Sequence, residues 1–224
     1  MSPAARIALL WAGFGLTHIG LSSVPVRARL VARLGELPFQ GLYSLVAFAF
    51  FIPLVATFFG HKHDGRWLWV FTRGTALHWT LYVGMAIAFV LEVASLVRPR
   101  PAAVVPGDPT PRGVYRITRH PLVMGVALFG ALHTLPNGST ADVAFFGGVV
   151  VFGLIGAWHQ DRRKLALGVP GFAAFHAATP FLPFTGRETL RGLRELSPAV
   201  VAAGIALTAV VRWFHPSWFG GFVD

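Results

Sequence analysis

Histidine side chains interrupt several of the most apolar stretches of this 224-residue chain. His18 and His133 each lie inside such a stretch, and Gly15 and Gly130 precede them by three residues. Two imidazoles from different helices are how a helical bundle holds haem iron, and small neighbours leave room for a flat porphyrin. The same pattern also serves close helix packing around a hydrogen-bonded histidine. Considered residue by residue, these two alternatives stay open.

Other histidines and one glutamate are further candidates for functional residues. His78 and Glu92 lie on one stripe of a single expected helix. His78 is a rival iron ligand, whereas Glu92 favours structural pairing with Arg98 or with later arginines. His159 lies near the end of another apolar stretch. The loop histidines of His61-Lys62-His63-Asp64 could bind a metal only weakly.

A basic cluster ends the longest proline-rich loop, which contains five prolines between Arg98 and His120. Its members are Arg112, Arg116, Arg119 and His120. Together they could bind an anionic lipid headgroup or the carboxylates of a cofactor. The alternative is a solvated cluster that fixes membrane orientation.

The elements that must position these residues are membrane-spanning helices. Hydrophobic residues make up 54% of the chain and charged residues only 12%, about half the charge of a soluble domain. A spanning helix needs roughly 20 mostly apolar residues. Six stretches meet or approach this length: Ala5–Ser23, Phe39–Gly60, Gly74–Leu96, Pro121–Leu135, Ala141–Trp158 and Pro198–Phe214. The sequence therefore predicts an all-α bundle of about six transmembrane helices, in one domain over residues 1–224. The short fourth stretch is expected to form a tight hairpin with the fifth.

The net charge of +10 indicates membrane orientation rather than binding to nucleic acid. If the six helices alternate, fourteen lysines and arginines fall on one side of the membrane and five on the other. Positive residues favour the cytoplasmic side, so both termini are expected outside the cytoplasm, in a multi-pass protein of the cytoplasmic (inner) membrane. The chain has no cysteine, which excludes disulfides, iron–sulfur clusters and zinc–thiolate sites.

A second long loop, over residues 160–197, ends in a short amphipathic turn. Leu190, Leu193 and Leu196 recur at spacing three, opposite Arg191 and Arg194. Such a segment is expected to lie in the membrane interface with its leucines in lipid. A lid over a site is the alternative.

Six motifs resemble, in order, those of the NnrU family, which includes plant 15-cis-zeta-carotene isomerase. They are L-T-H-I-G around His18, H-K-H-D-G-R-W-L-W from His61, F-V-L-E-V-A-S-L-V-R-P-R-P through Glu92, R-G-V-Y-R-I-T-R-H-P-L-V-M-G through His120, A-L-H-T-L around His133 and G-A-W-H-Q-D-R-R-K through Asp161. The resemblance covers roughly residues 5–185. It implies a polytopic protein that binds haem b through His18 and His133. The basic cluster, considered by itself, offers Arg116, Arg119 and His120 as further cofactor-binding candidates.

The function implied by this resemblance is a haem-dependent cis–trans isomerase of an apolar polyene or isoprenoid in the membrane. Its catalytic residues are not identified. The first alternative is a non-enzymatic haem-handling or assembly factor for denitrification or respiratory enzymes. The second is a lipid methyltransferase that uses S-adenosylmethionine, because the R-H-P segment also resembles isoprenylcysteine methyltransferases. Those enzymes carry two acidic residues where this chain has His159-Gln160-Asp161.

The expected topology puts His18 and His133 at different depths. His18 lies about 20 Å from the outer end of its helix at 1.5 Å per residue, whereas His133 lies close to the outer surface. Their depths would differ by roughly 10–15 Å. His78, near the outer end of its own helix, matches His133 more closely and is therefore the competing ligand.

Overall fold

The computed structural model describes residues 1–71, 74–97 and 109–220, and it is all helical apart from loops and one isolated bridge between Trp67 and Ser139 in this described part. The chain divides into two compact units, and each is assembled from segments distant in sequence. Unit 1 contains residues 1–71 and 133–167, and unit 2 contains residues 72–132 and 168–224. The prediction of a single domain over the whole chain stays a prediction.

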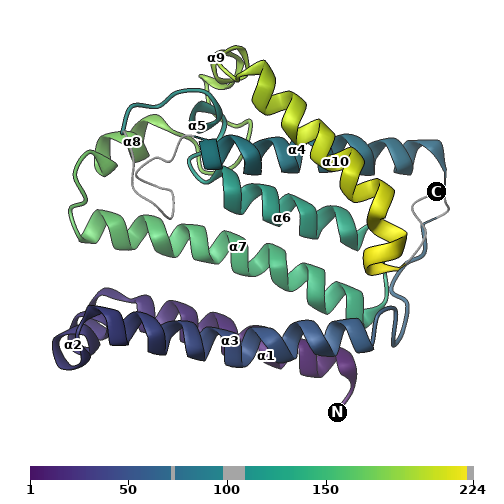
Figure 1. Ribbon diagram of the computed structural model, residues 1–224, viewed down its shortest axis with the longest axis horizontal. Coiled ribbons are helices and arrows are strands. Elements are labelled where there is room, and N and C mark those ends of the chain that lie inside the picture. Colours follow the sequence, from purple (N-terminus) through teal and green to yellow (C-terminus); the bar gives the residue numbers. More distant parts are fainter. Residues whose placement is uncertain (72–73, 98–108, 221–224) are drawn as a thin grey trace. The chain divides into compact units, whose positions relative to one another are not determined.

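Unit 1 consists of helices α1 (Pro3–Ser22), α2 (Val24–Leu34), α3 (Glu36–Gly60) and α7 (Thr140–Ala166). Helix α1 packs along both α3 and α7 (Figure 1). The close approach of α1 to α7 needs a glycine at position 148, because a Cβ there would overlap the indole ring of Trp11. Ser139 caps α7 by accepting a hydrogen bond from the Asp142 backbone N–H.

Unit 2 consists of α4 (Thr75–Val97), α5 (Val114–Ile117), most of α6 (Pro121–Thr134), α8 (Phe172–Ala178), α9 (Thr189–Arg194) and α10 (Pro198–Phe219). Helix α10 packs across α4 (Figure 1). A buried cluster joins the end of α4 to α5 and α8, with Leu91, Tyr115, Phe172 and Phe175 among its members.

Within the residues that the structure describes, five helices are long and apolar enough to cross a membrane, namely α1, α3, α4, α7 and α10. Helix α6 is apolar but has only 14 residues, about 21 Å at 1.5 Å per residue. It is joined to α7 by residues 135–139, which is the short hairpin expected from the sequence. The all-α membrane fold is therefore confirmed, with five full-length candidate spans and one short helix.

Two segments differ from the expected loops. Helix α7 does not end at Trp158 but continues to Ala166, so His159 and the following charged residues lie on a helix rather than in a loop. Arg27, Arg29 and Arg33 lie on α2, which follows α1 after a break at Ser23. Residues 98–108 of the proline-rich loop, with Arg98, lie outside the described residues. The multi-pass architecture is shown, whereas the orientation of the termini stays a prediction.

Candidate functional site

His18 lies near the end of α1 in an aromatic environment. Its ring centroid is 4.7 Å from that of Tyr43 on α3, 5.5 Å from that of Phe152 on α7 and 5.2 Å from that of Phe14. The Nδ1 atom of His18 is buried, and no hydrogen-bond partner for it exists among the described residues. Buried polar atoms in proteins are nearly always hydrogen-bonded, and the exceptions need a specific explanation. The Nδ1 atom of His18 is therefore available to bind a ligand.

A polar group lies one helical turn beyond His18. Ser22 is four residues further along the same face of α1, and its Oγ lies 3.2 Å from Nε2 of His159 on α7. His18 and His159 are close enough to interact electrostatically. The Tyr43 hydroxyl donates a hydrogen bond of 3.3 Å to the His18 carbonyl. The surroundings of His18 are therefore not purely apolar, because His159 of α7 lies close to this end of α1.

His133 also belongs to unit 1, at the end of α6, where its ring stacks on Phe146 of α7 with 4.8 Å between ring centroids. A continuous series of ring contacts joins His133 to His18, and we call its members the aromatic row: Phe146, Phe145, Trp11 and Phe152. The two histidines therefore contact α7 at positions 146 and 152. Six residues of helix correspond to about 9 Å along its axis.

The side chains of unit 1 have the chemistry that a histidine-ligated cofactor needs. Both histidines expected from the sequence are in this unit, and one has a buried ring nitrogen without a partner. Flat aromatic side chains surround them. His18 and His133 are the residues of this unit that would hold such a cofactor. Groups of three or more metal-binding side chains are absent from the part of the chain that the structure describes, so a site built from protein ligands alone is not found there.

The remaining candidate histidines occupy other positions. His78 lies in unit 2, in the first turn of α4, with its ring stacked on Tyr82. His61 pairs with Asp64 at 2.8 Å between Nδ1 and Oδ2. His63 pairs with Asp142 at 2.9 Å between the same atom types, and this aspartate is fully buried. The two loop histidines therefore bind carboxylates rather than facing each other.

Glu92 lies inside α4, against the backbone of α6. A Cβ added at Gly125 would lie 2.6 Å from its Cγ atom, so this glycine makes room for the glutamate. Arg98, one of its expected partners, lies outside the described residues.

The basic motif before α6 is largely buried in unit 2. Arg119 is 9% exposed and His120 only 3%. The Arg119 guanidinium donates to the Thr179 carbonyl at 2.8 Å and lies 5.2 Å from the centroid of the Phe181 ring. The His120 ring contacts the edge of the same phenylalanine. These two residues hold α6 to the segment after α8, and whether they also bind an anion stays a prediction.

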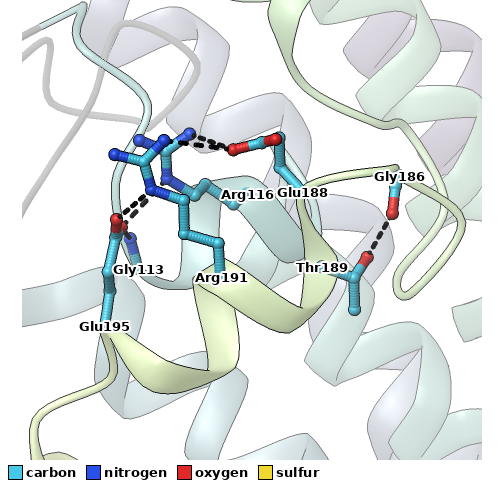
Figure 2. Close-up of polar contacts among 7 residues, drawn as sticks. All are labelled: Gly113, Arg116, Gly186, Glu188, Thr189, Arg191 and Glu195. Carbon is cyan, nitrogen blue, oxygen red and sulfur yellow. Dashed lines mark hydrogen bonds and ion pairs between the residues drawn. The ribbon is translucent and has the colours of Figure 1, made fainter.

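Arg116 belongs instead to a cluster of charges that connects α5 with α9 (Figure 2). Its Nη1 lies 3.0 Å from Glu188 and its Nε 3.0 Å from Glu195. Arg191 contacts the same two glutamates, at 3.4 and 3.0 Å. We call these four residues the ion-pair ring. Because each arginine meets both carboxylates, the four charges neutralise one another.

The ion-pair ring also fixes the backbone of the preceding loop. Gly113 adopts a positive φ of 56°, which favours glycine, and its N–H donates to Glu195 at 2.8 Å. This hydrogen bond, followed by the contacts of Arg116 and Arg191, lowers the pKa of Glu195. Gly192 of α9 lies so near that an added Cβ would be 2.8 Å from the Gly113 carbonyl oxygen.

A cavity of about 910 Å³ opens beside the ion-pair ring. One wall is apolar and comes from the end of α4 and the start of α10, with Val93, Ala94, Ala199, Val200 and Ala203 among its residues. Three arginines, Arg112, Arg116 and Arg191, line the opposite part together with Glu195. The cavity lies entirely within unit 2.

Sequence reasoning did not identify Ser22, Tyr43, Glu188 and Glu195 as members of these sites. The spacing of His18 and Ser22 is a usable signal, since residues four apart share a helix face. Glu188 and Glu195 alternate with arginines in a segment that was expected only to pack in the membrane interface. Nothing in their spacing shows that they reach a loop about 70–80 positions earlier in the chain.

Comparison with known proteins gives the chain a family. Two similar proteins are the 15-cis-zeta-carotene isomerases, chloroplastic, of Arabidopsis thaliana and Zea mays, 27% and 28% identical to it. The alignments cover 96% and 79% of this chain but only 60% and 50% of those relatives, so the chain spans less than two thirds of their length. No solved structure matches. Residues 6–222 match the model of the NnrU protein family, and the chain therefore belongs to the NnrU family.

Proposed function

We propose that this membrane protein is a cis–trans isomerase of an apolar polyene, with haem b bound in unit 1. The observation that carries this proposal is the buried Nδ1 atom of His18, which lacks a partner among aromatic rings. The names of the two relatives support the polyene as substrate class.

His18 and His133 are the residues that would hold haem b through their imidazoles. An imidazole ligates iron through a neutral ring nitrogen, and His18 has one that is not engaged by the protein. Haem b, when bound, supplies a redox-active and Lewis-acidic iron to the site. Arg116, Arg119 and His120, the further cofactor-binding candidates from the sequence, belong to unit 2, and their binding of the cofactor stays a prediction.

The protein's own contribution is to orient a flat apolar substrate and to exclude water. The aromatic row offers ring faces and edges over successive turns of α7, and such surfaces bind conjugated molecules by offset or edge contacts. The Tyr43 hydroxyl donates to the His18 backbone carbonyl, and the imidazole of His159 interacts electrostatically with that of His18. They would fix the position of the ligating ring at the edge of this apolar region.

The test uses the full chain purified in detergent, supplied with haem b. We expect a Soret band, a haem b pyridine-haemochrome spectrum, and conversion of a 15-cis polyene to its trans isomer by the ferrous protein. Haem binding without turnover would contradict the isomerase proposal and favour the assembly factor. Failure to bind haem would contradict both and leave the methyltransferase to be tested with S-adenosylmethionine.

A further inference from the structure

The cavity of unit 2 combines an apolar wall with a cationic edge, and this combination defines the chemistry of its occupant. Its volume of about 910 Å³ is within the range of small-molecule sites, roughly 300–1,000 Å³. The wall residues are small or branched aliphatics, among them Ala94, Ala199 and Ala203. Because alanine leaves the space beside a helix empty, an apolar chain can lie between α4 and α10.

The wall belongs to two candidate membrane spans. Val93 and Val97 are in the last turns of α4, whereas Ala199 and Ala203 are in the first turns of α10. The helix ends thus place the cavity where hydrocarbon gives way to headgroups. A hydrophobic chain directed along the spans and a polar head at their ends match this arrangement.

The cationic edge carries an excess of positive charge. Arg116 and Arg191 are neutralised within the ion-pair ring by Glu188 and Glu195. Arg112 is exposed on the same edge, and the described residues provide no interaction partner for its guanidinium. A guanidinium without a partner in the protein is well suited to a phosphate, which it can bind through two parallel hydrogen bonds.

The ion-pair ring makes this edge rigid before any ligand binds. Glu195 holds the Gly113 N–H and the Arg116 side chain, so Arg112 is next to a fixed glycine. The backbone beside Arg112 is thereby held in place, so less conformational entropy is lost in this loop when a ligand binds.

We propose that this cavity binds an anionic glycerophospholipid of the bilayer, with the phosphate at Arg112 and an acyl chain along the α4–α10 wall. The charge complementarity of the edge and the apolar wall both favour this occupant. This site is separate from the residues of unit 1 proposed to ligate haem, and it does not rest on the isomerase proposal.

The experiment measures binding of phosphatidylglycerol and of phosphatidylcholine with the same acyl chains to the full chain in detergent, by native mass spectrometry. We expect a preference for phosphatidylglycerol that Arg112→Gln reduces about tenfold, the loss expected from one charge-assisted contact. Arg187→Gln is the matched control, because Arg187 is an exposed arginine next to Glu188 in the sequence and does not line the cavity. Equal binding of both lipids, or equal loss in the two variants, would overturn the proposal.

A second variant tests the apolar wall. Ala203→Trp fills the space beside α10 and should weaken phosphatidylglycerol binding while the melting temperature stays close to that of the parent. Retention of full binding in this variant would overturn the placement of the acyl chain. Farnesyl diphosphate serves as the competing probe: if it binds more tightly than phosphatidylglycerol and depends on Arg112, the occupant is an isoprenoid phosphate and the phospholipid proposal is wrong.

Discussion

The surroundings of His18 in unit 1 and the ion-pair ring of unit 2 use polar residues in opposite ways. In unit 1, a few polar side chains lie among aromatic rings, and the His18 ring retains a buried nitrogen without a partner. In unit 2, Arg116 and Arg191 share two glutamates, and Arg119 is satisfied by a carbonyl and a ring. Satisfied charges rigidify a structure, whereas an unsatisfied buried nitrogen costs free energy unless a ligand binds it. The difference supports the proposal of a cofactor at His18, and it makes the ion-pair ring a structural frame beside the cavity of unit 2.

The largest expected effect comes from the helix contact that builds unit 1. Gly148→Leu would drive a side chain into the ring of Trp11, and overpacking of this kind costs up to about 3 kcal/mol. Thermal unfolding in detergent should show a clear loss of stability together with loss of haem binding. Gly147→Leu is the control, because an added Cβ there meets no atom within 4 Å. Equal destabilisation by both would mean that the α1–α7 contact is not as close as described.

The next effect concerns the buried arginine of unit 2. Arg119→Leu removes the donor to the Thr179 carbonyl, and a buried carbonyl left without a partner costs about 2 kcal/mol. We expect lower thermal stability with the haem spectrum unchanged. Loss of haem in a stable Arg119→Leu protein would instead make Arg119 a cofactor-binding residue, as its place in the basic cluster predicted.

A smaller, pH-dependent effect should come from the ion-pair ring. The pKa of Glu195 is lowered in the folded protein, so its ionised form stabilises the fold at pH values above about 4.3, the ordinary pKa of glutamate. This contribution is lost as the pH falls through the lowered pKa. Glu195→Gln should therefore be less stable than the parent at pH 7, and the difference should shrink toward acid pH. Melting curves between pH 3 and pH 7 measure it, and a constant difference would show that ionisation of Glu195 is irrelevant.

The smallest effect is expected in the exposed loop of unit 1. The His61–Asp64 pair is open to solvent on both sides, and such pairs contribute between about 0 and 1 kcal/mol. His61→Ala should change neither the melting temperature nor the haem spectrum appreciably. A strong spectral change would place a ligand in this loop.

The sequence predicted the helices well because long apolar stretches report membrane spans directly. The start of α3 and the end of α7 were missed by a few residues or more, since charged residues at helix ends resemble loops. The sequence also placed His18 and His133 correctly in apolar helices. The predicted span ended at Trp158, however, so it did not include His159, which lies on α7 because this helix continues to Ala166. The ring of Arg116, Arg191 and two glutamates depends on contacts between distant segments, which a single sequence does not encode in any local period.

The most direct test of the central claim is the absorption and electron paramagnetic resonance spectrum of the haem-loaded protein and of its single histidine variants. The account predicts low-spin iron in the parent, and high-spin or lost haem in both His18→Ala and His133→Ala, with His63→Ala unchanged. His78→Ala and His159→Ala are measured beside them, because His78 is the competing ligand by depth and His159 lies nearest to His18. A low-spin spectrum that survives His18→Ala would contradict the account, since the buried nitrogen of His18 would then hold no iron.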